Sequence, residues 1–288
     1  MKKVKIRASR DITLEDLLIE NNISRKLRRS LKAQGRIKKD SKVLYMSYPL
    51  KEGDIVTLYL EDTKSDIEPV EMPLDIIFED DELLVLNKPN NISCMSTLNM
   101  NEITLLNGLE YYFEKNNIND KVHMVNRLDR LTSGLMIVGK DRFSTSLLSS
   151  SLKKTLKRKY YAIVYGILDK KEDEITLKIA KENEMSVRRV VRNDGKEAIT
   201  RYKVIKEFNN YSLLEIELLT GRTHQIRVTF SFLGHPLVGD KSYSIYEDKE
   251  CLMLHSYYLE FIHPKDNKLY TFKTELPERF KDFINRNE

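Results

Sequence analysis

The chain has 288 residues, of which 41% are hydrophobic and 32% are charged, so it can bury a core and is not expected to be disordered. No apolar run reaches the roughly 18 residues of a membrane helix, and the start MKKVKIRASRD lacks the apolar stretch of a secretory signal. Two cysteines, Cys94 and Cys251, are too few for a disulfide framework and fit a reducing cytoplasm. The net charge of +5 is small, so the distribution of charge along the chain is a better guide to binding partners than the net value.

Residues 13–60 predict a compact unit of two helices and short strands. TLEDLLIENN places its leucines on one helical face, with Thr13 available as the N-cap. Ser24 is placed to cap a second helix, SRKLRRSLKAQG, and Gly35 to end it. RIKKDSKVLY follows as one strand-like segment, and IVTLYL alternates as a strand should.

The outer face of this second helix is basic, and the positive charge continues into the next segment. A solvated face is ordinarily the better interpretation, by roughly two to one. Because few acids balance the charge here, we favour a surface that contacts nucleic-acid phosphate. The residues expected to make these contacts are Arg25, Lys26, Arg28, Arg29, Lys32, Lys38 and Lys39.

An acidic, proline-containing stretch separates this unit from the rest of the chain and is typical of a linker. We therefore predict a small α/β domain at 1–62, a linker at 63–73 and a larger domain at 74–288. In the larger domain strands come in pairs more often than they alternate with helices, which predicts an α+β fold with a mostly antiparallel mixed sheet. Its expected elements are a hairpin (74–89), strands (135–140, 159–166, 198–208, 211–219 and 252–264) and helices (104–116, 142–154 and 222–234).

One acid in the larger domain is unusually placed. Asp129 lies between Arg127 and Arg130, and the apolar strand LMIVG begins within a few residues. A surface acid that pairs with its neighbours would contribute little. A loop at the edge of a core strand is, however, where catalytic groups are usually mounted. The segment LLTGRTHQIR has the same character, but the residues alone leave Arg222 equally consistent with a surface cation.

Other kinds of site are not indicated. The five histidines, His123, His224, His235, His255 and His263, lack the spacing of a metal centre, and the glycines form no phosphate loop. Ser133 lacks the surroundings of a nucleophile elbow, so a capping role for Thr132 and Ser133 is expected instead. We therefore expect neither a metal nor a cofactor.

Several segments together resemble one known family. RLDRLTSGL, KRKYYAIVYG, GKEAITRYKV, LLTGRTHQIRVTFSFLGHPLVGDKSY and LHSYYLEFIHP occur in the order found in the RluA family of RNA pseudouridine synthases, over roughly residues 74–280. The N-terminal unit resembles the small RNA-binding domain named after ribosomal protein S-four. The resemblance implies an isomerase with a pseudouridine synthase catalytic domain, acting on RNA without a cofactor.

The family pattern also implies roles for individual residues. Asp129 would be the catalytic aspartate, and Arg222 would pair with it. Tyr160 would stack on the target base, with Tyr161 as the alternative ring because only one of two neighbours in a strand can face the site. Arg127 would enter the RNA stack beside a flipped-out nucleotide, and Arg130 would face RNA as well.

The chain departs from the family at Asn126, where histidine is usual, at Leu131, where an acid is common, and in NNISCMS after NKP. We expect these departures to affect the substrate more than the activity. The expected partner is RNA, foremost large-subunit rRNA with tRNA as the other possibility, acted on by a monomer in the cytoplasm and away from membranes. The alternatives are a catalytically silent RNA-binding module and an acid-based nucleosidase or glycosidase, which would normally need a second acid.

Overall fold

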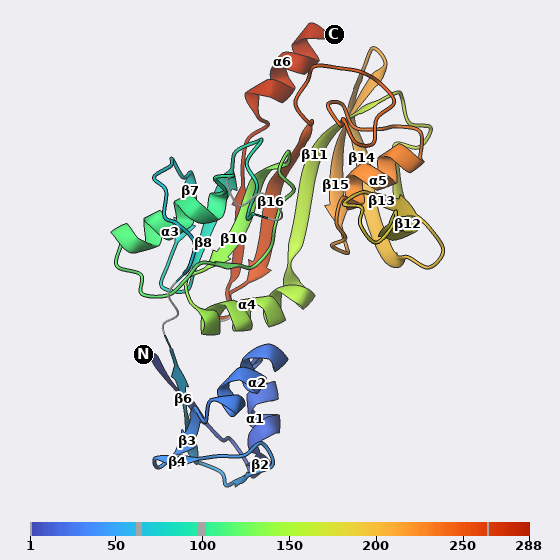
Figure 1. The fold of residues 1–288 in the computed structure, drawn as a ribbon. Coiled ribbons are helices and arrows are strands. Elements are labelled where there is room, and N and C mark those ends of the chain that lie inside the picture. The colour runs from blue at the N-terminus through green and yellow to red at the C-terminus, as the bar shows by residue number, and fades with distance from the viewer. Residues whose placement is uncertain (1, 62–64, 97–101, 264) are drawn as a thin grey trace.

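The computed structural model describes residues 2–61, 65–96, 102–263 and 265–288, which form two units (Figure 1). The N-terminal unit holds a four-stranded sheet in the order β1-β6-β3-β4 and a separate β2-β5 pair, with two helices against them. Its strands are β1 (Lys2–Arg7), β2 (Ile12–Thr13), β3 (Ile37–Lys39), β4 (Lys42–Val43), β5 (Pro49–Leu50) and β6 (Ile55–Leu60), and its helices are α1 (Leu14–Glu20) and α2 (Arg25–Ala33).

The predicted caps of these helices are confirmed. The hydroxyl of Thr13 accepts a hydrogen bond from the Asp16 amide at 3.2 Å, and that of Ser24 accepts one from Leu27 at 3.3 Å. RIKKDSKVLY is not one strand but the hairpin β3–β4. The reason is that Asp40 and Ser41 both have positive φ, 45° and 66°, which turns the chain back on itself.

The larger unit is built on an 11-stranded sheet, whose main path is β13-β12-β14-β15-β11-β16-β10-β8-β7. Every pair is antiparallel except β10 with β16, which confirms the predicted mostly antiparallel mixed sheet. The strands are β7 (Ile76–Glu79), β8 (Leu83–Lys88), β9 (His123–Met124), β10 (Ser133–Gly139), β11 (Lys157–Tyr165), β12 (Glu172–Lys181), β13 (Arg189–Val191), β14 (Lys196–Phe208), β15 (Tyr211–Leu218), β16 (Leu254–Ile262) and β17 (Leu269–Lys273).

Four helices cover this sheet: α3 (Leu105–Lys115), α4 (Arg142–Thr155), α5 (Gln225–Phe232) and α6 (Glu278–Arg286). The strands β1, β2, β5, β9, β12, β13 and β17 and the helix α6 were not predicted. For β12 a signal existed, since Ile175, Leu177 and Ile179 alternate with polar residues. Among the described residues no helix is long and apolar enough to cross a membrane.

Strand alternation decides which side chains face the functional side of the sheet. Along β10, Met136 and Val138 join the core cluster that includes α3 and α5, whereas Leu135 and Ile137 pack on the opposite face with α4. The same alternation on β11 sends Tyr160 into the first cluster and Tyr161 to the side covered by α6.

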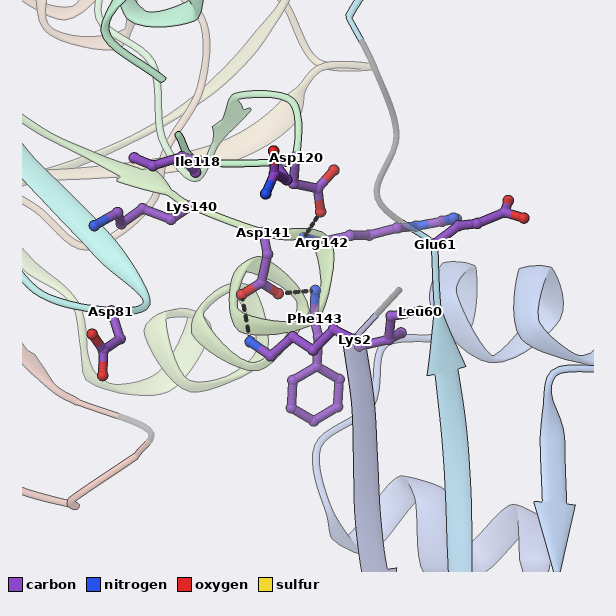
Figure 2. Close-up of a pocket in the computed structure, with 11 residues that line it drawn as sticks. Lys2, Leu60, Glu61, Asp81, Ile118, Asp120, Lys140, Asp141, Arg142 and Phe143 are labelled. Atoms are coloured by element: carbon purple, nitrogen blue, oxygen red, sulfur yellow. Dashed lines mark hydrogen bonds and ion pairs between the residues drawn. The ribbon is translucent and has the colours of Figure 1, made fainter. Parts of the chain in front are cut away.

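The two units are in contact as well as linked. Phe143 and Leu147 of α4 pack against the core of the N-terminal unit, and the Ser24 amide donates to Ser146 Oγ at 2.8 Å. Lys2 Nζ lies 2.8 Å from an oxygen of Asp141, beside a cleft of about 270 Å³ (Figure 2). Residues 65–73 form no helix or strand, and the predicted boundary between residues 62 and 63 lies outside the described residues.

Candidate active site

A cleft of about 700 Å³ lies at one edge of the β10–β11–β16 region. Asp129 projects into it from the loop between β9 and β10, with 28% of its side chain exposed. The described residues that line the cleft also include Asn126, Arg127, Arg130, Arg158, Tyr160, Arg222, His224 and Arg227. The cleft therefore gathers all the site residues predicted in the larger domain.

The loop that carries Asp129 is tied to the strand that follows it. The backbone carbonyl of Asp129 accepts a hydrogen bond from the Thr132 amide at 3.1 Å, which closes a turn. The Asn126 side chain accepts from the Ile137 amide of β10 at 2.7 Å, so the departure from the usual histidine does serve local hydrogen bonding. The expected capping role of Ser133 is wrong. Its hydroxyl instead joins His255 Nδ1 (2.8 Å) and Arg279 (2.7 Å), and burial lowers the pKa of His255 to about 3.

A fully buried lysine, Lys88, is hydrogen-bonded to the backbone of the same loop. Lys88 Nζ donates to the carbonyls of Pro89 and Ile92, each at 2.9 Å, and to that of Arg130 at 3.1 Å. The ammonium group thus joins the loop after β8 to the loop of Asp129. Burial lowers the pKa of Lys88 to about 8, although the nearby Cys94 and Asp129 act in the opposite direction. The sequence analysis missed this residue, because nothing in the pattern distinguishes a buried lysine at a strand end.

The expected ion pair between Asp129 and Arg222 is not formed. Arg222 Nε donates to the Glu197 carbonyl at 2.8 Å, and its side chain lies exposed on the rim. Arg227 takes the expected place, with Nη1 3.6 Å from Asp129 Oδ2. Its guanidinium also makes a bidentate pair with the buried Asp240, at 2.7 Å for both bonds. The sequence did contain a signal for Arg227, which is the only charged residue in the apolar run QIRVTF. A buried arginine is nearly always paired, so this position could have been predicted to have an acidic partner.

His224 is the second nitrogen-bearing side chain close to Asp129. Its Nε2 lies 3.6 Å from Asp129 Oδ2, and its Nδ1 lies 2.7 Å from the hydroxyl of Tyr243. Burial lowers the pKa of His224, so the ring is neutral near pH 7. The residue was noted in the sequence but given no role.

The choice between the two neighbouring tyrosines is decided by the sheet. Tyr160 lines the cleft and is buried, and burial raises the pKa of its hydroxyl. Tyr161 faces the other side and stacks on Tyr257, with ring centroids 3.9 Å apart. Only Tyr160 can therefore meet a ligand in the cleft.

The predicted RNA contacts fall in two separate places. Arg127 and Arg130 are exposed at the cleft, with Arg130 3.7 Å from Glu102. On the N-terminal unit α2 exposes Arg25, Lys26, Arg29 and Lys32. The side chains of the other three predicted residues already have partners within the protein. Arg28 pairs with Glu15 (3.5 Å), Lys39 pairs with Asp54 (2.6 Å) and Lys38 lies over the Tyr59 ring (5.3 Å).

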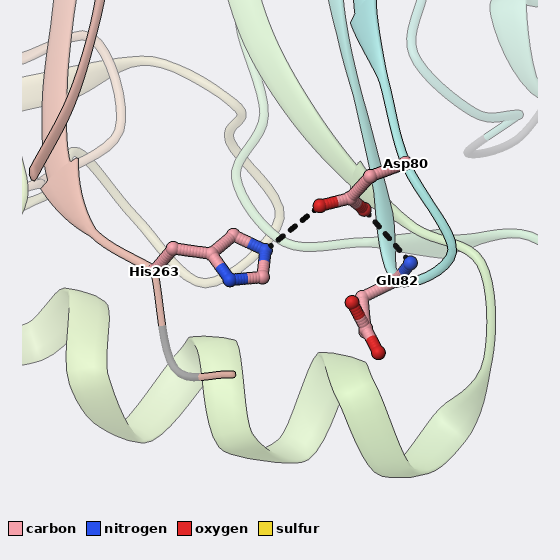
Figure 3. A group of neighbouring side chains, drawn as sticks. All are labelled: Asp80, Glu82 and His263. Atoms are coloured by element: carbon pink, nitrogen blue, oxygen red, sulfur yellow. Dashed lines mark hydrogen bonds and ion pairs between the residues drawn. The ribbon is translucent and has the colours of Figure 1, made fainter. Parts of the chain in front are cut away.

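One group among the described residues has the ligand types of a metal site: Asp80, Glu82 and His263 (Figure 3). The Lys265 amide donates to His263 Nδ1 at 3.3 Å, and His263 Nε2 lies 3.1 Å from an oxygen of Asp80. Lys265 Nζ also lies 3.1 Å from Glu82. The Asp80–His263 and Glu82–Lys265 contacts connect the β7–β8 turn to the segment that follows β16.

Comparison with known proteins agrees with this architecture. Residues 82–232 match the family model described as RNA pseudouridylate synthase. The chain is 35% identical to the uncharacterized RNA pseudouridine synthase YjbO of Bacillus subtilis, over 95% of this chain and 98% of the relative. It is 31% identical to ribosomal large subunit pseudouridine synthase D of Pasteurella multocida, over 82% of this chain and 77% of that protein.

Among solved structures, human RNA pseudouridylate synthase domain containing 1 superposes with a TM-score of 0.59 at 25% identity. The match covers 73% of this chain and 86% of the human chain. Fold and cleft thus define an RNA-modifying isomerase. The chain belongs to the family of RNA pseudouridine synthases, as its resemblance to the RluA group implied.

Proposed function

We propose that this synthase converts specific uridines of large-subunit ribosomal RNA to pseudouridine, with Asp129 as the reactive group. The observation that carries the proposal is the position of the Asp129 carboxylate, in an open cleft between Arg227, His224 and the ring of Tyr160. The choice of ribosomal RNA is supported by relatives whose names include the ribosomal large subunit.

The reaction needs only what the cleft provides. The bond from ribose C1′ to uracil N1 breaks, the ring turns, and a bond from C1′ to C5 forms. C5 gives up a proton and N1 gains one, so nothing is consumed. A carboxylate can serve as the nucleophile or stabilise the charge that develops.

A uridine in a stacked helix cannot reach the cleft and must be flipped out, at a cost of roughly a few kcal/mol. We propose that the exposed Arg127 fills the vacated space, since a planar guanidinium can stack and hydrogen-bond at once. Tyr160 would pack on the flipped base, a contact of roughly 1–3 kcal/mol. The N-terminal unit would act as an S-four-like RNA-binding domain, and we place the monomeric enzyme in the cytoplasm, where it would meet ribosomal RNA.

The test is to delete the gene, map pseudouridines in total RNA, and restore either the wild-type chain or Asp129→Asn. We expect at least one site in large-subunit RNA to vanish and to return only with the wild type. Loss of a transfer-RNA site instead would reject the ribosomal assignment. With purified protein, mass spectrometry should show RNA of unchanged mass. A mass lowered by loss of the base would identify a nucleosidase.

A further inference from the structure

Tyr243 connects several groups of the cleft and belongs to the loop between α5 and β16. It is buried, and the guanidinium carbons of Arg227 and Arg188 lie 4.9 Å and 5.5 Å from its ring centre. Its hydroxyl accepts a hydrogen bond from the Arg189 amide at 2.8 Å and lies 2.7 Å from His224 Nδ1. These contacts hold both the ring and the hydroxyl in one position.

This arrangement determines the tautomer of His224. A phenol hydroxyl has one proton to donate, and a backbone amide can only donate. Arg189 already donates to the Tyr243 oxygen, and among the described residues His224 Nδ1 is the only acceptor within hydrogen-bond distance of this hydroxyl, so the Tyr243 proton is directed to His224 Nδ1. A neutral imidazole that accepts at Nδ1 carries its own proton at Nε2. That is the nitrogen 3.6 Å from Asp129 Oδ2.

The backbone holds His224 in the same orientation. Its φ is 58°, a left-handed conformation at the N-cap of α5 that is uncommon for a residue other than glycine. Arg227, one turn further along α5, contacts the same oxygen of Asp129 at 3.6 Å. Two donors from one helix end thus converge on Oδ2. Such contacts are often long in a free enzyme and tighten when substrate closes the site.

We propose that Tyr243 and His224 form a relay that fixes the catalytic carboxylate. Tyr243 acts as a positioning residue that sets the His224 tautomer, and the Nε2–H of His224 then holds Asp129 Oδ2 while Oδ1 faces the reacting nucleoside. The inference rests on the proposed role of Asp129, and it adds a residue pair that the sequence motifs alone do not assign.

The first experiment measures the tautomer directly in the full chain, by NMR with nitrogen-labelled histidine near neutral pH. We expect the wild type to show Nε2–H at His224 and Tyr243→Phe to lose this preference. An Nδ1–H tautomer in the wild type would overturn the relay whatever the enzyme does. The measurement needs no activity, so it is independent of whether Asp129 proves to be the reactive group.

The second experiment is kinetic. Tyr243→Phe keeps the ring between the two arginines, and we expect kcat to fall about tenfold, as for one hydrogen bond lost in the transition state, with KM within about twofold. Tyr202→Phe is the matched control, because Tyr202 is also buried and its hydroxyl donates to the Lys170 carbonyl at 3.1 Å, away from the cleft. Equal rates for the two variants would contradict the proposal.

A pair of His224 variants covers the case in which Tyr243→Phe does not fold. The amide nitrogen of glutamine extends about as far as Nε2, whereas that of asparagine extends only as far as Nδ1. Asparagine tolerates the left-handed backbone better, so a purely structural role predicts that His224→Asn is the more active. The relay predicts the reverse, with His224→Gln within about threefold of the wild type and His224→Asn lower by about tenfold or more. The opposite order, or equal rates, would refute it.

Discussion

The two units of this synthase use positive charge in opposite ways. On α2 of the N-terminal unit, Arg25, Arg29 and Lys32 are exposed. In the catalytic unit the cations that matter, Lys88 and Arg227, are buried and each is fixed by two or more acceptors. Exposed charges attract RNA at long range and are screened by salt, whereas buried charges contribute only in one geometry. We therefore expect the first group to control affinity and the second to control rate.

The largest expected effect is at the carboxylate itself. Asp129→Asn keeps the size of the side chain but removes its charge and nucleophilicity, so the rate should fall by at least about a thousandfold. RNA binding should stay within about twofold, because the basic surface of α2 is unchanged. Single-turnover assays on one defined RNA and a gel-shift titration measure the two quantities. A near-wild-type rate would remove Asp129 from the mechanism.

The next effect distinguishes the two arginines near the cleft. Arg227→Met leaves Asp240 buried and unpaired, which should lower the free energy of unfolding by about 3–5 kcal/mol and the rate by about a hundredfold. Arg222→Met removes only a rim contact and should change both much less. Urea denaturation and single-turnover rates test this. As a control, Arg227→Met with Asp240→Leu should recover much of the stability but not the rate. Comparable losses for the two single variants would contradict the assignment.

Lys88 gives a prediction on pH. Its pKa of about 8 in the folded protein lies below the value of roughly 10.4 for an unfolded chain. The unfolded state therefore binds more protons between these values, and stability should gain a contribution as pH rises from about 8 to about 10. Lys88→Met should lack that contribution, and its rate should fall about tenfold because the carbonyl of Arg130 loses its donor.

Urea midpoints measured from pH 7 to pH 10 isolate the effect as the difference between variant and wild type. Lys140→Met is the control, since Lys140 pairs with Glu79 at 2.7 Å and does not line the cleft of Asp129. Parallel pH profiles for Lys88→Met and the wild type would show that the buried lysine does not titrate in this range.

A smaller effect on chemistry is expected from the exposed charges. Replacing Arg25, Arg29 and Lys32 by glutamine should weaken RNA binding and reduce the salt slope by about two to three, while the rate at saturating RNA is kept. Substitution is preferable to removing the unit, because Phe143 and Leu147 pack on it and would be exposed. Lys51→Gln, at an exposed ion pair of the same unit, serves as the control. A lower saturating rate would mean that α2 also positions the substrate.

The smallest effect is expected at Asn126. Its side chain accepts one hydrogen bond from Ile137, and an unprotonated ring nitrogen of histidine can do the same. Asn126→His should therefore stay within about threefold of the wild-type rate, with a similar melting temperature. A variant that folds but is inactive would mean that Asn126 sets the geometry of the cleft.

Much of the fold could be predicted because it depends on local patterns. Thr13 and Ser24 cap their helices because a short hydroxyl before an apolar periodic segment satisfies free amides within the same turn. Alternation in β11 separates Tyr160 from Tyr161 in the same way, since successive strand residues must face opposite sides. The short strand β13 carries little periodic signal and was missed. In β17, Tyr270 and Phe272 alternate with more exposed residues, but the strand has only five residues and was missed as well.

By itself the sequence determined the two-unit organisation, the mixed sheet and the loop that presents Asp129. Only the tertiary structure decided which partners reach that carboxylate. Arg222 and Arg227 are both near the start of α5, but one turns outward to Glu197 while the other is drawn inward by Asp240. Lys88 and the Tyr243–His224 pair likewise obtain their partners from distant segments. Local periodicity specifies the face on which a side chain lies, whereas the contacts it makes depend on how separate elements pack together.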